Sequence, residues 1–157
     1  MGKKAPGIKI IGFGNKYMSD DGIGIRTIEE LEKEKDLKGA ELIDGGTSGL
    51  DLIFYLQTSD KIILIDAVDA GQKTGEIKVL SAGNIEKFVT RKLSSYSLHD
   101  FDLSQVLGMA KSLGLLSRLT IIGIKPKKID FGTALSPEIE KRMPDLLAEV
   151  KKEIFSH

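Results

Sequence analysis

Acidic residues that directly follow apolar stretches are the most promising chemical groups in this chain. The segment "GFGNKYMSDDGIG" (residues 12–24) contains Asp20 and Asp21. Asp44 follows "AELI", Asp66 follows "KIILI", and His99 is one of only two histidines. One imidazole with two carboxylates suits a borderline divalent metal ion. The chain has no cysteine, so a thiolate ligand and a cysteine nucleophile are both excluded.

The glycine-rich segment could bind either a phosphate or a cation. It lacks the third glycine of the dinucleotide fingerprint, where Tyr17 stands, and it lacks the Lys-Ser or Lys-Thr pair of a P-loop. Two aspartates at the start of a helix repel a phosphate and attract a cation. One of them is expected to cap that helix, and the pair is informative because a cap needs only one carboxylate. The cation interpretation is favoured.

Each of the other candidates also has a structural explanation. Asp44 precedes two glycines and is a common turn former. Asp66 follows a buried apolar run, where a carboxylate needs a partner. His99 fits a packed or surface histidine as well as a ligand, although a position just before a helix favours the neutral, metal-binding imidazole.

The elements that position these residues follow from the apolar pattern. Buried strands are predicted at residues 8–13, 40–44, 76–82 and 117–126. A further strand is predicted in "DKIILIDAVDA", where residues 62–65 are continuously apolar and the polar end of the strand begins at Asp66. Helices are predicted at residues 22–35, at 47–57 with a Thr47 or Ser48 cap, at 99–114 with an Asp102–Gln105 capping box, and from Ser136 onward with a break at Pro144. Residues 85–98 show no clear pattern.

Alternating strands and helices predict a single α/β domain over residues 1–157, with a mostly parallel sheet and helices on both faces. Ligands of such sheets gather at the carboxyl ends of the strands. The acids that follow the strands are therefore expected at one edge of the sheet, within reach of His99.

The overall composition narrows the functional class. Lysine and arginine together number 23, as do the acidic residues, which argues against a broad nucleic-acid surface. No apolar run approaches the roughly 18 residues of a membrane span, and the first residues lack the apolar centre of a signal peptide. A cytoplasmic monomer is the default expectation.

Five segments together resemble the hydrogenase maturation endopeptidases, in order from Ile8 to about Val150. They read "GFGNKYMSDDGIGIRTIEEL", "DGGTSGLDLIFYL", "IILIDAVDAG", "SLHDFDLSQVLGMAKSLG" and "IIGIKP…LSPEIEKRMP". The resemblance implies a five-stranded twisted sheet between helices. It also implies an endopeptidase that removes the C-terminal extension of a nickel–iron hydrogenase large-subunit precursor after nickel insertion.

The resemblance also assigns residues. Asp21, Asp66 and His99 match the family's metal-contacting trio, and Asp44 matches a further aspartate near the cleft. Our hypothesis is that nickel carried by the precursor meets this trio, which positions the tail and reports that metal loading is complete. Asp21 and Asp66 would then take part in catalysis through the metal, while Asp44 orients a ligand or acts as base. Lys125 departs from the family pattern and, with Lys127 and Lys128, predicts a basic loop.

Three alternatives stay open from the sequence. The first is an α/β module that binds a nucleotide or small molecule without proteolytic activity. The second is a self-sufficient metallopeptidase on a related sheet. The third is a structural adaptor, which leaves the acids at the strand ends unexplained.

Overall fold

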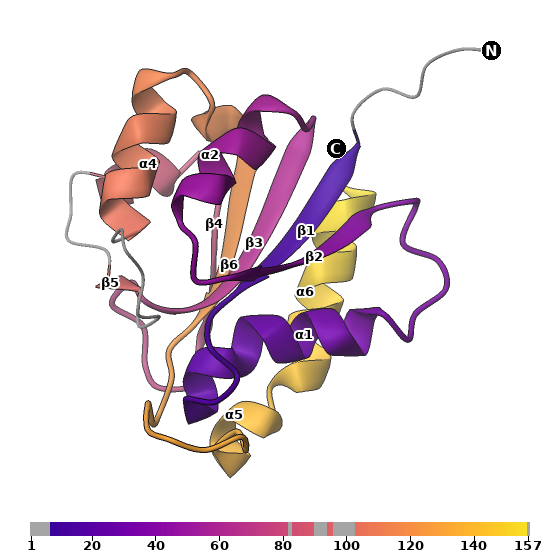
Figure 1. The fold of residues 1–157 in the computed structure, drawn as a ribbon, viewed down its shortest axis with the longest axis vertical. Helices are drawn as coiled ribbons and strands as arrows, with labels where there is room; N and C mark the ends of the chain where they lie inside the picture. Colours follow the sequence, from indigo (N-terminus) through magenta and orange to yellow (C-terminus); the bar gives the residue numbers. More distant parts are fainter. Residues whose placement is uncertain (1–6, 82, 90–93, 96–102, 157) are drawn as a thin grey trace.

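The computed structural model describes residues 7–81, 83–89, 94–95 and 103–156 (Figure 1). The strands are β1 Ile8–Phe13, β2 Glu41–Gly46, β3 Lys61–Asp69, β4 Ile77–Leu80, β5 Ser94–Ser95 and β6 Leu119–Ile124. The α-helices are α1 Ile23–Leu31, α2 Leu50–Gln57, α3 Ile85–Val89, α4 Leu103–Ser112, α5 Pro137–Glu140 and α6 Met143–Phe155. Two 3₁₀ helices, η1 Ser19–Gly22 and η2 Leu116–Arg118, complete the elements.

The main sheet has the strand order β2-β1-β3-β6-β4. All neighbouring pairs are parallel except β4 and β6, and the short β5 pairs antiparallel with the end of β3. Helices cover both faces of this sheet (Figure 1). The predicted five-stranded, mostly parallel α/β architecture is therefore confirmed.

One apolar core fills each face of the sheet. On one face β3 and β6 pack with α2, α3 and α4, and on the other they pack with α1, α5 and α6. Alternate residues of β3 supply the two cores, because side chains of a strand point to opposite faces in turn. Within the described part of the chain, every helix is too short or too polar to span a bilayer.

Several predicted boundaries differ from the structure. The third strand was expected to end at Asp66, but β3 continues to Asp69 because Asp66 pairs with Gly123 of β6 and Val68 pairs with Ser95 of β5. Neither Thr47 nor Ser48 caps α2, whose N-cap is Gly49.

Two further predictions concern the ends of helices. The expected break at Pro144 is present, since α5 and α6 are separate segments. Asp102 of the predicted capping box lies outside the described residues.

Gly24 allows the start of α1 to lie directly on the sheet. A Cβ atom built on Gly24 would come within 2.4 Å of the carbonyl oxygens of Phe13 and Ile65. Any side chain here would collide with backbone atoms of β1 and β3. The residues just before Gly24, which include Asp21, are therefore held against the carboxyl ends of these two strands.

We expect Gly24→Ala to lower the free energy of unfolding by about 2 kcal/mol or more, because rigid backbone has to shift to admit the methyl group. Gly108→Ala is the matched control, since Gly108 lies in α4 and a Cβ added there would meet open space beyond its own helix. That control should gain up to about 1 kcal/mol from the better helix propensity of alanine. Urea unfolding of both variants measures the difference, and equal stabilities would contradict the close contact.

Candidate active site at the carboxyl edge of the sheet

The glycine-asparagine loop after β1 binds one of the two adjacent aspartates. The backbone N–H of Asn15 donates to Asp21 Oδ2 over 2.9 Å, and the N–H of Tyr17 donates to Asn15 Oδ1 over 2.9 Å. The N–H groups of Gly14 and Met18 donate to the carbonyl oxygens of Gly46 and Asn15. These amide groups are thus engaged within the protein, and one of them orients a carboxylate.

Asp20 has a structural role that differs from the predicted helix cap. Its fully buried carboxylate accepts hydrogen bonds from the backbone N–H groups of Lys127, Lys128 and Ser136 and from the Ser136 hydroxyl, at 2.7–3.0 Å. It therefore fastens η1 to the loop after β6 and to the start of α5. Sequence reasoning missed this role because the partners lie more than a hundred residues away, and no local pattern marks them.

Asp66 projects from β3 on the face that α2 and α4 cover. Leu64 and Val68, two positions away on either side, belong to the core of that face, and Asp66 itself is 1% exposed. The N–H of Ala67 donates to Asp66 Oδ1 over 2.8 Å. Because η1 contacts β3 and Gly24 touches Ile65, Asp21 and Asp66 belong to the same end of the sheet.

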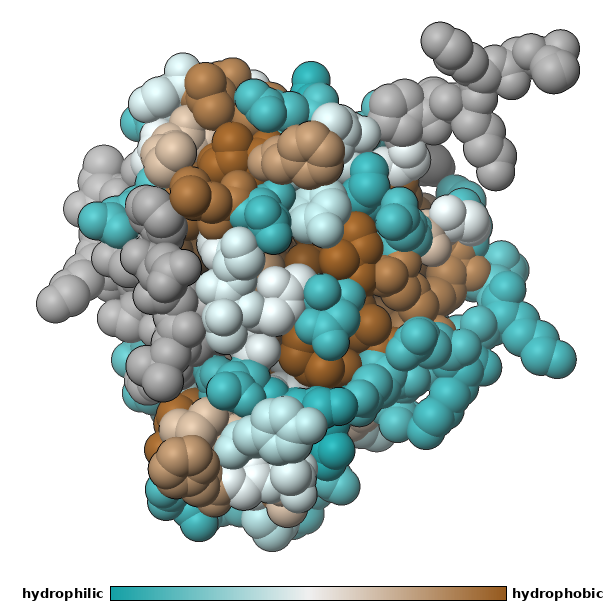
Figure 2. All heavy atoms as spheres, in the orientation of Figure 1, coloured by the Kyte–Doolittle hydropathy of each residue, from teal (hydrophilic) through white to brown (hydrophobic). Residues whose placement is uncertain are grey.

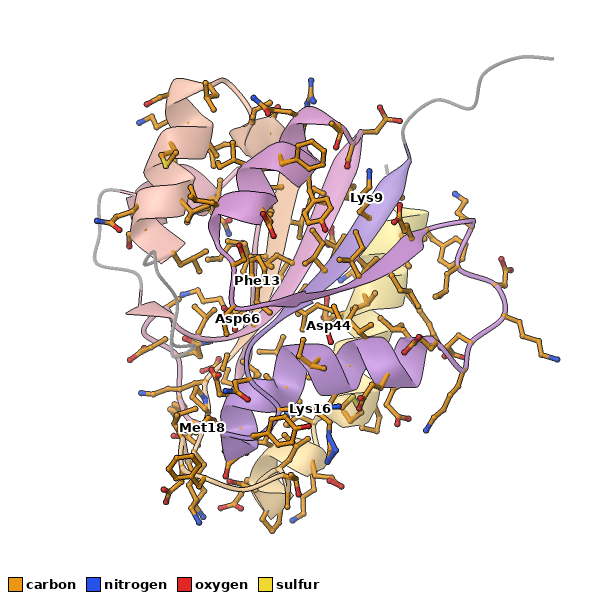
Figure 3. The ribbon with its side chains drawn as sticks, viewed as in Figure 1. Lys9, Phe13, Lys16, Met18, Asp44 and Asp66 are labelled. Carbon is orange, nitrogen blue, oxygen red and sulfur yellow. The ribbon has the colours of Figure 1, made fainter. Side chains whose placement is uncertain are left out.

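Asp44 lies at the same edge but on the opposite face. It pairs with Gly12, which faces α1, so its side chain projects toward the α1 side (Figure 3). It is exposed, and its Oδ1 accepts the N–H of Gly46 over 3.0 Å. A cavity of about 300 Å³ adjoins it, lined by Asn15, Lys16 and Tyr17 among others. The sheet thus separates Asp44 from Asp66.

His99 lies outside the described residues, so its position relative to the acids stays a prediction. The nearest described residues along the chain are Ser95, which pairs with Val68 just beyond Asp66, and Leu103 at the start of α4. Among the residues that the structure describes, no three His, Cys, Asp or Glu side chains gather into a metal site.

The loop after β6 is less basic than its sequence predicts, because each of its lysines lies near a carboxylate. Lys125 Nζ is 3.9 Å from Asp69 Oδ2, and Lys128 Nζ is 3.9 Å from Asp130 Oδ2. Lys127 donates a hydrogen bond to Glu138 and so holds the pKa of that carboxyl below its usual range. The expected basic surface is largely neutralised by these pairs.

Comparison with known proteins gives consistent matches. A family model described as hydrogenase maturation protease matches residues 25–153. The hydrogenase expression/formation protein HoxM of Azotobacter vinelandii is 35% identical over 91% of this chain and 70% of its own length.

Two solved structures extend the comparison. The hydrogenase maturating endopeptidase HybD of Escherichia coli superposes with a TM-score of 0.75 at 29% identity, covering 91% of this chain and 88% of its own. A hydrogenase 2 maturation peptidase from a Thaumarchaeota archaeon, SCGC_AB-539-E09, superposes with a TM-score of 0.66 at 26% identity, covering 94% and 97%.

Proposed function

This chain belongs to the hydrogenase maturation protease family, and we propose that it cleaves the C-terminal extension from a nickel–iron hydrogenase large-subunit precursor once nickel is in place. The observation that carries this proposal is the pair of buried carboxylates at the carboxyl edge of the sheet. Asp21 and Asp66 are each 1% exposed and come from elements that touch each other. Two carboxylates at one buried edge create a negative potential that favours a bound cation.

The precursor's nickel ion is the cation that this arrangement suits, with Asp21, Asp66 and His99 as its contacts. Asp21 is oriented by the Asn15 N–H and Asp66 by the Ala67 N–H, so both carboxylates approach the ion from fixed positions. The ion belongs to the substrate, and contact with it positions the scissile bond. Polarisation of the scissile carbonyl or activation of a water molecule by the ion then supplies the hydrolytic chemistry.

Asp44 acts from the other side of the sheet edge, on the tail of the precursor. Its carboxylate faces the cavity beside the glycine-asparagine loop, where it orients the tail or serves as base. Asp66 emerges on the α2–α4 face, so the two acids have separate tasks. The precursor tail would pass around the ends of β1 and β2 to contact both Asp44 and Asp66.

Covalent geometry supports the assignment of His99. Ser95 is hydrogen-bonded to the end of β3, opposite Val68, and His99 follows only four residues later. Four residues of fully extended chain span at most about 14 Å. This short tether to the strand that carries Asp66 supports the proposal that His99 contacts the same ion.

We expect His99→Ala to abolish removal of the tail from a nickel-loaded precursor without changing the fold, because the variant loses the imidazole that we propose contacts the ion. His157→Ala is the matched control, since it removes the other histidine of the chain. Loss of precursor mass on a mass spectrometer measures processing, and far-ultraviolet circular dichroism checks the fold. Normal processing by His99→Ala would remove the histidine from the mechanism.

The whole proposal is tested by mixing the protein with the large-subunit precursors of its host, each prepared with and without nickel. A mass loss that requires nickel in the precursor supports the proposed function. Cleavage of generic peptides with added metal, and no need for a loaded partner, would instead indicate a self-sufficient metallopeptidase. A nucleotide-binding module is disfavoured, because the loop N–H groups that a phosphate needs are engaged with Asp21 and with other protein oxygens.

A further inference from the structure

The loop between β6 and α5 is fixed to the glycine-asparagine loop by a set of hydrogen bonds. Met18 and Gly132 form a β-bridge, in which the N–H of Ser19 donates to Gly132 O over 2.9 Å and the N–H of Gly132 donates to Tyr17 O over 3.0 Å. The Ser19 hydroxyl donates to Asp130 O over 2.8 Å. With the bonds to Asp20, these contacts make residues 127–136 a preorganised extension of the site.

This fixed loop presents large apolar side chains to solvent. Phe131 is 89% exposed, the highest value among the exposed large apolar residues described, and Tyr17 on the bridged segment is 59% exposed. Figure 2 shows hydrophobic atoms at the surface over this end of the molecule, where Figure 3 labels Met18 below Asp66. Single exposed apolar residues are common, but here two aromatic residues lie on neighbouring segments that hydrogen bonds join.

The charged neighbours of these aromatic residues are locally balanced. Lys128 lies near Asp130, Lys127 binds Glu138, and Lys16 lies 3.9 Å from Glu29 and also over the Tyr17 ring, with its Nζ 5.8 Å from the ring centroid. Paired exposed charges exert only a weak, screened field. Recognition at this surface therefore depends on apolar contact rather than on charge.

We propose that Phe131 and Tyr17 form a docking surface for an apolar segment of the hydrogenase precursor that flanks the cleaved tail. The inference rests on the proposed function, which requires the precursor to reach Asp21. Asp21 directly follows Asp20, and Asp20 holds the docking loop through its carboxylate. Hydrogen bonds join this loop to the segment that leads into Asp21, so a precursor segment next to the cleaved tail can bury both rings and gain affinity where orientation matters.

Processing kinetics of Phe131→Ala test the inference, with the nickel-loaded precursor as substrate. We expect KM to rise about tenfold while kcat stays within twofold, because the ring contributes binding rather than chemistry. Tyr17→Ala should raise KM in the same direction, and raising the salt concentration should leave the wild-type KM nearly unchanged. Phe54→Ala is the matched control, since Phe54 is as exposed as Tyr17 but lies on α2. Its kinetics should equal those of the wild type.

The possible outcomes separate this inference from the proposed function. Normal processing by the wild type with an unchanged KM in Phe131→Ala overturns the docking surface and leaves the function intact. An equal rise of KM in Phe54→Ala also overturns the assignment to this loop. If Phe131 instead joins two copies of this chain, size-exclusion chromatography of the wild type shows a dimer that Phe131→Ala abolishes, and the inference fails. Absence of any processing by the wild type overturns both proposals.

Discussion

Asp66→Asn should reduce the rate of precursor processing by about a thousandfold or more, which corresponds to roughly 4 kcal/mol of lost transition-state stabilisation. The substitution keeps the size of the side chain, and its amide oxygen can still accept the Ala67 N–H. It removes only the negative charge that we propose meets the precursor's nickel. The desolvation of the buried Asp66 carboxylate offsets much of what its contacts contribute to stability. Loss of the charge should therefore lower the free energy of unfolding by no more than about 1 kcal/mol.

The matched control for this prediction is Asp69→Asn, three residues further along β3. Asp69 is about one-third exposed and lies near Lys125, so the control removes the same charge from the same strand outside the buried edge. We expect its processing rate to stay within about threefold of the wild type, because exposed ion pairs contribute little. Equal losses in both variants would show that general charge, rather than the position of Asp66, governs the rate.

Asp20→Ala should lower the free energy of unfolding by about 3 kcal/mol, although the residue contacts no substrate in our proposal. The substitution leaves the N–H groups of Lys127, Lys128 and Ser136 without the acceptor that they share. Hydrogen bonds to a charged acceptor are worth about 1.5–3 kcal/mol each, and water can replace some of them once the loop opens. Urea unfolding measures the loss, and processing should fall as well because the docking loop is released.

Asp130→Ala serves as the control, because it removes an exposed carboxylate from the same loop. Its side chain is 63% exposed and lies 3.9 Å from Lys128 Nζ, a pair worth at most about 1 kcal/mol. A stability of Asp20→Ala equal to that of Asp130→Ala would contradict the role of Asp20 as a clamp. The proposal that Asp20 holds the loop after β6 while Asp21 contacts the ion would then fail.

Local patterns in the sequence were sufficient for the order and type of most elements. The apolar runs of β1, β3 and β6 and the helical spacing of α1 and α4 depend only on neighbouring residues, and alternation of strands and helices then favours a parallel sheet. The same reasoning placed acids after the strands, at the edge where ligands of such sheets bind. The family resemblance added the prediction that Asp21, Asp66 and His99 contact a metal ion, which no local pattern specifies.

Only the tertiary structure decided where the acids lie relative to one another. The register between β1 and β2 sends Asp44 to one face, while the alternation of β3 sends Asp66 to the other. Asp20, rather than Asp21, fastens η1 because the hydrogen-bond donors come from the loop after β6 and the start of α5. These donors lie more than a hundred residues later in the chain. These outcomes follow from contacts between distant segments, because register and packing are properties of pairs of elements and have no signature within either one.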